Sequence, residues 1–548
     1  MNFQENSPAA TTTRVIFANQ ARKELYAGLK IAADAVSCTL GPKGKTVLIQ
    51  QHGSVPLVTK DGVTVSRSVK LKDPVQRMGA ELIREAANRT NEVAGDGTTT
   101  ATVLTHSMVQ EGLKLLEGGY SATNLCKGLE KTTQYVVETI KRNAKKLTTT
   151  NEVAQVGTIS ANGDVKIGQL IAEAMQRVGT DGIITVEDAK GTQTSMDITE
   201  GMQFERGYLS PYFVTNNDKM NVVQQNAYVL VTDKKLSSLR ELIPLLEKVI
   251  QTQSPLLIIA DDVEGEALQG LVLNRIKTNL PVVAIKAPGY ATHRSELLQD
   301  ICVLTGATLV SSATGVSLEQ VGLKELGRCK KVIVDSKTTT LVSDTTTKES
   351  IETHVADLKT QLEDVTLGTD EVTKLKLRIA KLSSGVAVIK VGGATEVEMI
   401  ERKYRIEDAL NATRAAAEEG IVSGGGMALA YIANTLHEFI ESIQDPEERM
   451  GGMIVLKACL APLRGIAHNA SLSSDVLLAK LKTQYSVSND NNVGYNVDSG
   501  ELCDMFSFGV IDPAKVTRTA LQNAASVAVT FLTLDAVVVE DDTERQCQ

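Results

Sequence analysis

The chain has 548 residues and carries 57 Lys and Arg against 66 Asp and Glu, a formal net charge of −9. This length is too great for one ordinary hydrophobic core and indicates about two to four domains. The acidic balance excludes the basic footprint of a protein that binds nucleic acid or an anionic membrane. The chain contains no Trp and only 8 Phe and 11 Tyr, so the aromatic anchors of most tight interfaces are scarce.

The seven cysteines are scattered without a C-x-x-C pair, and the six histidines show no metal-ligand spacing. We therefore expect reduced thiols and neither a disulfide framework nor a zinc site. No uninterrupted apolar run approaches the ~20 residues that span a bilayer. The first residues, MNFQENSPAATTTR, lack the apolar core of a signal peptide. A cytoplasmic protein is expected, with the bacterial cytosol favoured.

In chain order, the first part of the sequence is mostly helical. Apolar residues recur at helical spacing over 18–40, 74–92 and 99–117, and two short β-like runs lie at 46–50 and 63–65. From about residue 150, β-branched runs alternate with helical stretches, which indicates an α/β domain. We expect strands at 182–187, 228–232, 256–260, 282–286 and 331–334, and helices at 237–251, 264–278 and 294–304.

A long charged segment over 349–382 predicts a helix or helical hairpin, and long Ala- and Leu-rich helices return after Gly420. The order is therefore helical, α/β, helical. It predicts one domain inserted into another, whose two parts come from the two ends of the chain.

Three glycine-rich segments are candidate phosphate-binding loops: TLGPKG (39–44), AGDGTTT (94–100) and SGGG (423–426). Glycines let backbone N–H groups approach a phosphate, and a helix start adds further donors. The carboxylate of Asp96 suits the Mg²⁺ that accompanies a nucleotide. Taken alone, the second segment is more typical of an ordinary helix start with Asp96 or Thr98 as the cap. The P-loop pattern G-x-x-x-x-G-K-[ST] is absent.

Two helical segments in the middle of the chain are apolar on more than one face. They are SSLRELIPLLEKVIQ (237–251) and the stretch over 264–275. Such helices either lie between two layers of a core or leave one apolar face exposed. The residues alone favour the buried pair.

Several long motifs resemble the group I chaperonins, the bacterial GroEL and 60-kDa heat-shock protein family. They are TLGPKGK (39–45), TKDGVTV (59–65), GDGTTTATVL (95–104), AQVGTISAN (154–162), EGMQFERGYLSPYF (200–213), DVEGEAL (262–268), SGVAVIKVG (384–392), EDALNATRAAAEEGIVSGGG (407–426) and DPAKVTRTALQNAASVA (512–528). The resemblance runs in order from about residue 14 to 540.

The resemblance implies a multidomain α and α/β fold. A helical equatorial ATPase domain comes from both chain ends (1–142 and 420–548), a small α/β intermediate domain from 143–200 and 386–419, and an inserted α/β apical domain from 201–385. Gly201, Gly385 and Gly420 match the hinges between them. The implied activity is ATP hydrolysis coupled to the capture, encapsulation and release of non-native proteins. The implied cofactors are ATP and Mg²⁺, with K⁺ expected.

The resemblance also assigns residues to the ATP site. The implied nucleotide-binding positions are Thr39, Leu40, Gly41, Pro42, Lys60, Asp96, Gly97, Thr98, Thr99, Thr100, Gly425, Asn496 and Asp512, with Asp96 as the metal ligand. The implied catalytic carboxylates are Asp61 and Asp408. From the residues alone, Asp408 is an ordinary acidic residue near a helix start.

The apical domain carries the implied binding surface for clients and for a 10-kDa co-chaperonin. Its positions are Tyr208, Tyr212, Phe213, Ile243, Leu246, Leu268, Val272, Leu273 and Asn274. The implied assembly is a homo-oligomer of seven-membered rings, usually two of them stacked back to back, without nucleic acid or a membrane span. The chain departs from the family at its end, where VVVEDDTERQCQ replaces a Gly- and Met-rich tail. A specialised paralogue with altered clients or a non-folding binding role is therefore the alternative.

Overall fold

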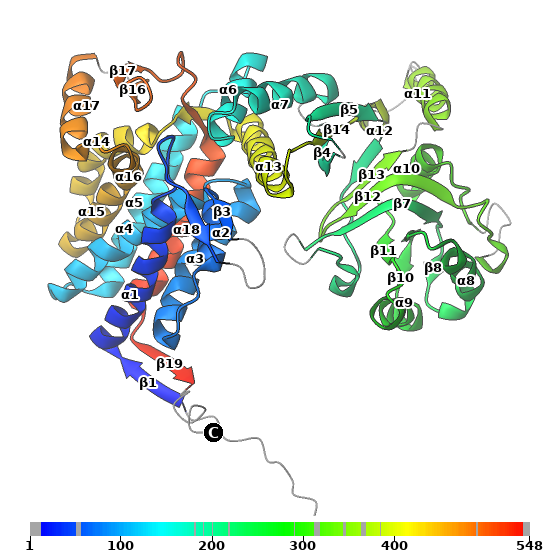
Figure 1. Cartoon of the computed structure of the whole chain (residues 1–548), viewed down its shortest axis with the longest axis horizontal. Coiled ribbons are helices and arrows are strands. Elements are labelled where there is room, and N and C mark those ends of the chain that lie inside the picture. The colour runs from blue at the N-terminus through cyan, green and yellow to red at the C-terminus, as the bar shows by residue number, and fades with distance from the viewer. Residues whose placement is uncertain are drawn as a thin grey trace, which may run out of the picture. The chain divides into compact units, whose positions relative to one another are not determined.

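The computed structural model describes residues 13–50, 56–179, 182–189, 191–199, 201–216, 220–289, 291–311, 318–343, 347–362, 369–383, 385–488 and 492–540. The chain divides into two compact units (Figure 1). The terminal unit comprises Met1–Glu173 and Ile400–Gln548, and the inserted unit comprises Ala174–Met399. The prediction that one folded part interrupts another is confirmed. The predicted division into three domains at the boundaries given above stays a prediction.

Long helices that pack side by side form the terminal unit (Figure 1). They are α1 (Ala18–Ser37), α3 (Pro74–Ala94), α4 (Thr98–Glu117), α5 (Ala122–Asn143), α14 (Met427–Ser442), α15 (Pro446–Cys459), α16 (Ala461–Asn469), α17 (Ser474–Ser488) and α18 (Ala514–Thr533), with the shorter α2 (Gly62–Ser68) and α6 (Thr150–Ser160). Two further helices, α7 (Val165–Val178) and α13 (Glu396–Glu419), begin in one unit and end in the other. Helix α18, from the C-terminal part, packs against α3, α4 and α5.

Small residues let these helices approach closely. Helix α1 buries Ala21, Leu25 and Leu29 at four-residue spacing. A Cβ added to Gly28 of α1 would lie 1.8 Å from the backbone oxygen of Gln76 in α3, so only glycine fits there. The close approach of backbones explains how a chain with few aromatic residues fills its core.

Short antiparallel pairs connect distant parts of the terminal unit. They are β1 (Thr13–Phe17) with β19 (Ala536–Glu540), β2 (Val47–Ile49) with β3 (Leu57–Thr59), β15 (Ile421–Ser423) with β18 (Ile511–Pro513), and β16 (Val493–Asn496) with β17 (Glu501–Asp504). The β1–β19 pair joins the two ends of the described chain. Residues 63–65, predicted as a β-like run, instead lie in helix α2. That prediction is wrong because the Asp61 side chain caps a helix at this point.

A six-stranded mixed sheet forms the centre of the inserted unit, with strand order β11-β9-β7-β12-β13-β6. The strands are β6 (Gly201–Phe204), β7 (Val222–Val231), β9 (Leu256–Ala260), β11 (Val282–Lys286), β12 (Gly327–Val334) and β13 (Thr339–Ser343). The β7, β9 and β11 strands are parallel, and β9 is buried along its whole length. A continuous apolar run such as LLIIA is typical of a parallel strand covered on both faces.

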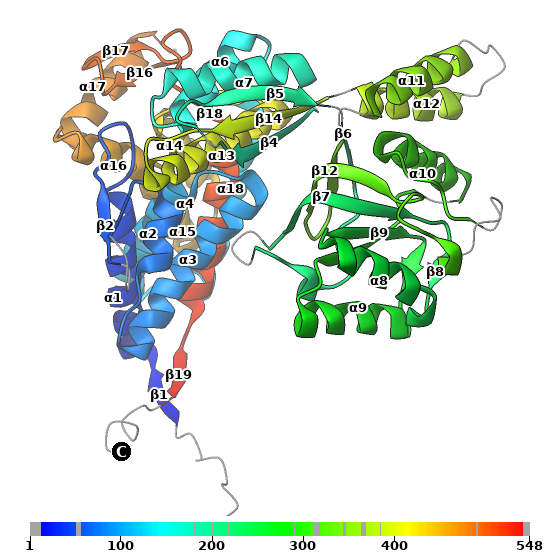
Figure 2. The ribbon, with the colours of Figure 1, turned by 45° about the vertical axis from the view of Figure 1, so that its right-hand side comes forward.

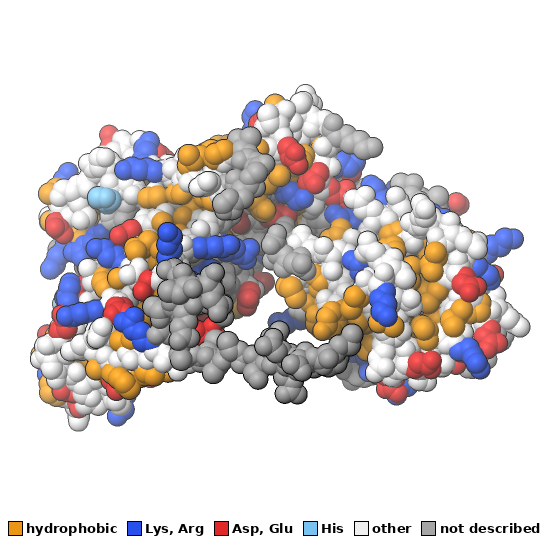
Figure 3. Space-filling model, turned by 60° about the horizontal axis from the view of Figure 1, so that its bottom comes forward, with side chains coloured by type: hydrophobic (Ala, Val, Ile, Leu, Met, Phe, Trp, Pro, Cys, Tyr) orange, Lys and Arg blue, Asp and Glu red, His pale blue; other side chains and the backbone are white. Residues whose placement is uncertain are grey.

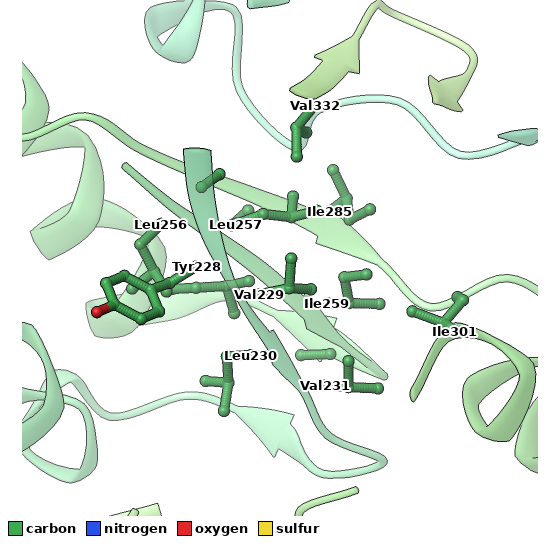
Figure 4. Packing of buried hydrophobic residues seen from close by; sticks show 14 of the residues in the cluster. Tyr228, Val229, Leu230, Val231, Leu256, Leu257, Ile259, Ile285, Ile301 and Val332 are labelled. Atoms are coloured by element: carbon green, nitrogen blue, oxygen red, sulfur yellow. The ribbon is translucent and has the colours of Figure 1, made fainter. Parts of the chain in front are cut away.

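Helices cover both faces of this sheet. Figure 2 shows α8 (Ile243–Thr252) and α9 (Gly265–Thr278) on one side and α10 (Ala291–Thr305) on the other. Figure 4 shows the aliphatic side chains of β7, β9 and β11 packed together, with Ile301 of α10 beside them. The short segments η1 (Pro211–Phe213), η2 (Leu239–Glu241), η3 (Leu318–Gln320), β8 (Lys235–Leu236) and β10 (Asp262–Val263) complete this part of the unit.

A helical hairpin and a second sheet complete the inserted unit. The hairpin is α11 (Lys348–Leu362) with α12 (Thr369–Ser383), as the charged segment over 349–382 predicted. The three-stranded sheet has the order β4-β14-β5, from β4 (Ile183–Asp188), β14 (Val386–Val391) and β5 (Ser195–Thr199). The predicted strands and helices of this region are confirmed, with differences of up to six residues at their ends: β7 begins at Val222 instead of residue 228, and α8 begins at Ile243 instead of residue 237, after the separate short turn η2.

One stretch of the described chain is long and apolar enough to cross a membrane, the helical segment Pro446–Asn469. Within it, 61% of the most apolar window is buried. Its buried residues, among them Ile454 and Val455, pack in the core of the terminal unit with side chains of α4, α5 and α18. This burial is typical of a core helix of a globular protein.

Candidate functional site

The loop between α3 and α4 has the geometry of an anion-binding helix start. Gly97 precedes α4 in the left-handed conformation, with φ 84°, and a Cβ there would lie 2.5 Å from Val516 Cγ1. Among the described residues, no side chain caps α4. The backbone N–H groups of Thr98, Thr99 and Thr100 therefore remain available at the positive end of the helix dipole, which suits a phosphate.

Asp96 lies inside this loop and is held by two hydrogen bonds. Its Oδ1 accepts from the backbone N–H of Gly97, and its Oδ2 accepts from Ser160 Oγ at 3.1 Å. Burial raises the pKa of Asp96, the two hydrogen bonds oppose this, and the charge of Asp61 raises the pKa further. The net pKa is raised, so a cation beside Asp96 would stabilise the ionised carboxylate.

Asp61 serves as the N-cap of α2. Its Oδ1 accepts from the backbone N–H of Val63 at 3.0 Å, and its Oδ2 from that of Thr64 at 2.9 Å. The next residue, Gly62, lies against the start of α4, since a Cβ added there would be 2.2 Å from Thr99 Oγ1, so the structure places Asp61 beside the phosphate loop. Lys60 is exposed immediately before it. The capping role is observed, and the catalytic role of Asp61 stays a prediction.

The glycine-rich segment 423–426 lies against Asp512. Strand β15 pairs with β18, which places Val422 opposite Asp512, and the backbone N–H of Gly425 donates to the Asp512 carboxylate. Burial and then the charge of Asp96 raise the pKa of Asp512 to about 7, against the effect of the Gly425 hydrogen bond. Segments separated by more than 400 residues in the sequence thus meet around Asp96.

The loop over residues 39–44 is anchored from α16 and from the β16–β17 hairpin. Asn469 Nδ2 donates to the backbone oxygens of Ser37 and Leu40, each at 2.9 Å. Lys43 Nζ lies 3.1 Å from Asp498 Oδ1 in the hairpin turn. Asn496 Oδ1 accepts from the backbone N–H of Asp498 at 2.9 Å. The predicted positions Thr39, Leu40, Gly41, Pro42 and Asn496 therefore belong to two connected segments of the terminal unit.

Helix α13 brings a further carboxylate toward the phosphate loop. Asn411 Nδ2 donates to the backbone oxygen of Gly95 at 3.5 Å, a long hydrogen bond. Asp408 is half-buried and lies three residues earlier on α13, hence on the same side of the helix. Sequence reasoning missed Asn411 and Ser160 as site residues. Both lie within the resembling motifs, but no residue-type rule distinguished them from their neighbours.

The carboxylates fit a metal that is shared with phosphates. No group of three or more His, Cys, Asp or Glu side chains in the described ranges could by itself hold a metal ion. Mg²⁺ usually binds through one or two carboxylates together with phosphate oxygens and water. Asp96, beside an uncapped helix start, meets that requirement.

Comparison with known proteins identifies the family. A model of the TCP-1/cpn60 chaperonin family matches residues 32–542. The chain belongs to the TCP-1/cpn60 chaperonin family.

This chaperonin is similar in structure to the chaperonin gp146 of the bacteriophage EL 2 (Pseudomonas aeruginosa), crystallised in the presence of ATP-BeFx. In one crystal form the TM-score is 0.65 at 23% identity, and in another it is 0.59 at 24% identity. Each match covers 96% of this chain and 99% of the phage chain. At this identity, the likeness supports the chaperonin fold, which confirms the predicted fold class.

The inserted unit of the chaperonin carries an exposed apolar surface. Tyr212 of η1 is 67% exposed and Leu273 of α9 is 51% exposed, and Ile243 of α8 is also exposed. Figure 3 shows hydrophobic side chains gathered on the side of the inserted unit that faces the viewer. Tyr208, Leu268 and Val272 are half-buried and pack against the core beneath. We call Tyr212, Ile243, Leu268, Val272 and Leu273 the apolar surface.

Two predicted contact residues lie under this surface and not on it. Phe213 is 0% exposed and Leu246 is 5% exposed, and both belong to the core around the sheet. Both are buried because α9 packs against η1 and the sheet core covers Leu246, and client contact through these two residues stays a prediction. Asn274 donates from Nδ2 to the backbone oxygen of Gly270 in its own helix. Sequence reasoning missed Ile276, which is exposed one turn after Val272 on α9.

Proposed function

We propose that this chaperonin hydrolyses ATP with Mg²⁺ and uses the cycle to capture non-native proteins and promote their folding. The observation that carries the proposal is the uncapped start of α4, with Asp96 in the loop before it and the segments that carry Asp61 and Asp512 packed against that loop through Gly62 and Val516. Carboxylates attract the metal cation, and the free N–H groups at the helix start attract the phosphate anion. A site that offers both therefore suits a nucleotide with its bound metal ion.

The residues have separate roles in this proposal. The N–H groups of Thr98 to Thr100 bind phosphate oxygens, and Asp96 holds the metal, which offsets phosphate charge when bound. Lys60 adds positive charge beside Asp61. The two carboxylates Asp61 and Asp408 orient and deprotonate the attacking water, an effect worth about 10²–10⁴-fold.

The base and the ribose of the nucleotide are uncharged, so they are bound through packing contacts and hydrogen bonds. We assign these to the segment from Thr39 to Pro42, to Gly425, to Asn496 and to Asp512. The Lys43–Asp498 ion pair supports this assignment, because it connects the first segment to the hairpin that carries Asn496. A bound K⁺ is part of the proposal as well.

The apolar surface is the proposed site for non-native proteins. Contacts through aliphatic side chains depend on buried area more than on direction, so they tolerate many partners. The family implies oligomeric rings and client binding. We propose seven-membered rings, two of them stacked, in the cytoplasm, closed by a 10-kDa co-chaperonin that binds the same surface. Repetition of a weak site around a ring would supply avidity.

Phosphate release from ATP, measured on the assembled protein with and without Mg²⁺, tests the enzymatic part. We expect turnover that requires Mg²⁺ and that ceases when Asp96→Ala removes the metal ligand. Turnover that persists in chelator, or in Asp96→Ala, contradicts the proposed site. The variant Asp475→Ala is the matched control, since it removes an exposed carboxylate of α17 that pairs with Arg464 and lies outside every segment assigned to the nucleotide.

A further inference from the structure

The carboxylate of Asp96 receives a hydrogen bond from a second element of the terminal unit. Ser160 is the last residue of α6, and its Oγ donates to Asp96 Oδ2 at 3.1 Å. The other oxygen, Oδ1, accepts from the backbone N–H of Gly97 in the loop itself. One donor is therefore fixed by the loop, and the other depends on the position of α6.

The position of α6 is determined by its packing. Thr149 and Glu152 form a capping box at its start, and Val156 is fully buried with Ala412, Ile421 and Ile511. These partners come from α13, β15 and β18. Their packing directs the last turn of α6, and with it the Ser160 hydroxyl, to the phosphate loop.

We propose that Ser160 is a positioning residue for the metal-holding carboxylate of Asp96. This inference rests on the proposed function. Each carboxylate oxygen has two lone pairs, so Oδ2 can accept from Ser160 and still bind a metal. The hydrogen bond fixes the rotation of the carboxylate.

This hydrogen bond matters because the Asp96 carboxylate has one partner on each oxygen. Removal of the Ser160 hydroxyl would leave only the Gly97 N–H on Oδ1, so the rotation of the carboxylate would no longer be fixed at Oδ2. Partners that orient metal ligands typically change metal affinity by about 10–100-fold when they are removed.

The same contact couples metal binding to α6. If Asp96 held the metal in its observed orientation, in which Oδ2 accepts from Ser160 Oγ, metal binding and this hydrogen bond would favour the same position of the carboxylate. Binding therefore stabilises the docked position of α6 through Asp96, and by reciprocity the docked α6 stabilises the bound metal.

The test compares Ser160→Ala and Ser160→Thr in the full-length assembled protein. Two readouts are measured against Mg²⁺ concentration: binding of a fluorescent ADP analogue and phosphate release at saturating ATP. We expect Ser160→Ala to raise the half-saturating Mg²⁺ concentration about 10–100-fold in both readouts. The maximal rate returns at high Mg²⁺, and Ser160→Thr, which keeps a hydroxyl, restores most of the affinity.

Ser442→Ala is the matched control. Ser442 also ends a helix, α14, but its Oγ donates to Phe439 in its own helix, so the Mg²⁺ dependence should not change. An unchanged Mg²⁺ dependence in Ser160→Ala overturns the inference, as does a lower maximal rate without a shift in Mg²⁺ dependence. If the unaltered protein shows no Mg²⁺-dependent binding or turnover, the proposed function itself fails, and the inference fails with it.

Discussion

The proposed nucleotide site consists of polar and charged groups, whereas the apolar surface consists of hydrophobic side chains. The nucleotide site uses backbone N–H groups and carboxylates that hydrogen bonds hold in place, as Gly97 and Ser160 hold Asp96. The apolar surface consists of side chains such as Tyr212 and Leu273 that lie exposed above a core. The first arrangement is directional and suits one ligand, whereas the second depends on area and suits many.

This difference predicts where single substitutions should act. A change in the nucleotide site should alter a rate or a metal dependence while the fold persists. A change on the apolar surface should alter client binding, and a change just beneath it should alter stability. The following variants test each part of the comparison.

Asp408→Ala should have the largest effect on the chemical step. We expect ATP hydrolysis to fall about 10²–10⁴-fold while nucleotide binding persists, because the phosphate-binding N–H groups of α4 are unchanged. Phosphate release and nucleotide affinity are measured in parallel. The neighbouring variant Glu407→Ala is the control. Near-normal hydrolysis by Asp408→Ala would remove this residue from the mechanism.

Phe213→Ala should act through stability. The side chain is fully buried, so its loss should lower the free energy of unfolding of the inserted unit by about 3–5 kcal/mol. Denaturant unfolding measures this change. A variant that unfolds like the unaltered protein but no longer binds clients would show instead that Phe213 contacts them directly.

Tyr212→Glu should weaken client capture without affecting ATP turnover. The side chain is 67% exposed, so the fold tolerates the change, while the loss of apolar contact area lowers the affinity for clients about tenfold or more. Suppression of aggregation of a denatured client measures this. Val476→Glu, at an exposed valine of α17 in the terminal unit, is the matched control. Equal capture by both variants would argue against the surface.

The smallest predicted effect is the release of a proton when the nucleotide binds. Asp512 has a pKa raised to about 7 by burial and by the charge of Asp96. A cation at Asp96 lowers that pKa, so binding of Mg²⁺–nucleotide should release up to about one proton near pH 7. Affinity should therefore rise with pH up to about 7 and level off above it.

Titration calorimetry in buffers of different ionisation enthalpy measures the number of protons released on binding, and Asp512→Asn should abolish this release.

The raised pKa of Asp512 also makes the stability of the nucleotide-free protein depend on pH. Because the folded pKa exceeds the unfolded value of about 4, the contribution of Asp512 to stability is full below pH 4 and is lost as the pH rises through about 7. In the calorimetric experiment, proton uptake on nucleotide binding, in place of proton release, would contradict the raised pKa of Asp512.

The sequence predicted the framework of both regions. Strands β9 and β11 were predicted at their observed ends, and the motif GDGTTT was placed correctly at a helix start. Such features are local, since a continuous apolar run or a Gly-Asp-Gly turn determines its own conformation. The error at 63–65 is also local in origin, because the pattern VTV was weighed without the capping side chain of Asp61.

The contacts between distant segments could not be predicted in this way. The hydroxyl of Ser160 reaches Asp96 across 64 residues of sequence, because the packing of α6 on α13 and β18 places it there. The exposure of individual side chains could not be predicted from the sequence either, because it also depends on contacts between distant segments. Tyr212 and Phe213 are adjacent aromatic residues in one motif, yet one is exposed and the other fully buried. The sequence resemblance treated them alike, and only the packing of η1 separates them.

The most direct test of the account is refolding of a chemically denatured client by the assembled protein with ATP, with and without a 10-kDa co-chaperonin. The yield is compared among the unaltered chain, Asp408→Ala and Tyr212→Glu. We expect ATP-dependent recovery by the unaltered chain, capture without productive release by Asp408→Ala, and weak capture by Tyr212→Glu. Equal recovery by all three proteins, or recovery independent of ATP, would contradict the coupling of the nucleotide site to the apolar surface.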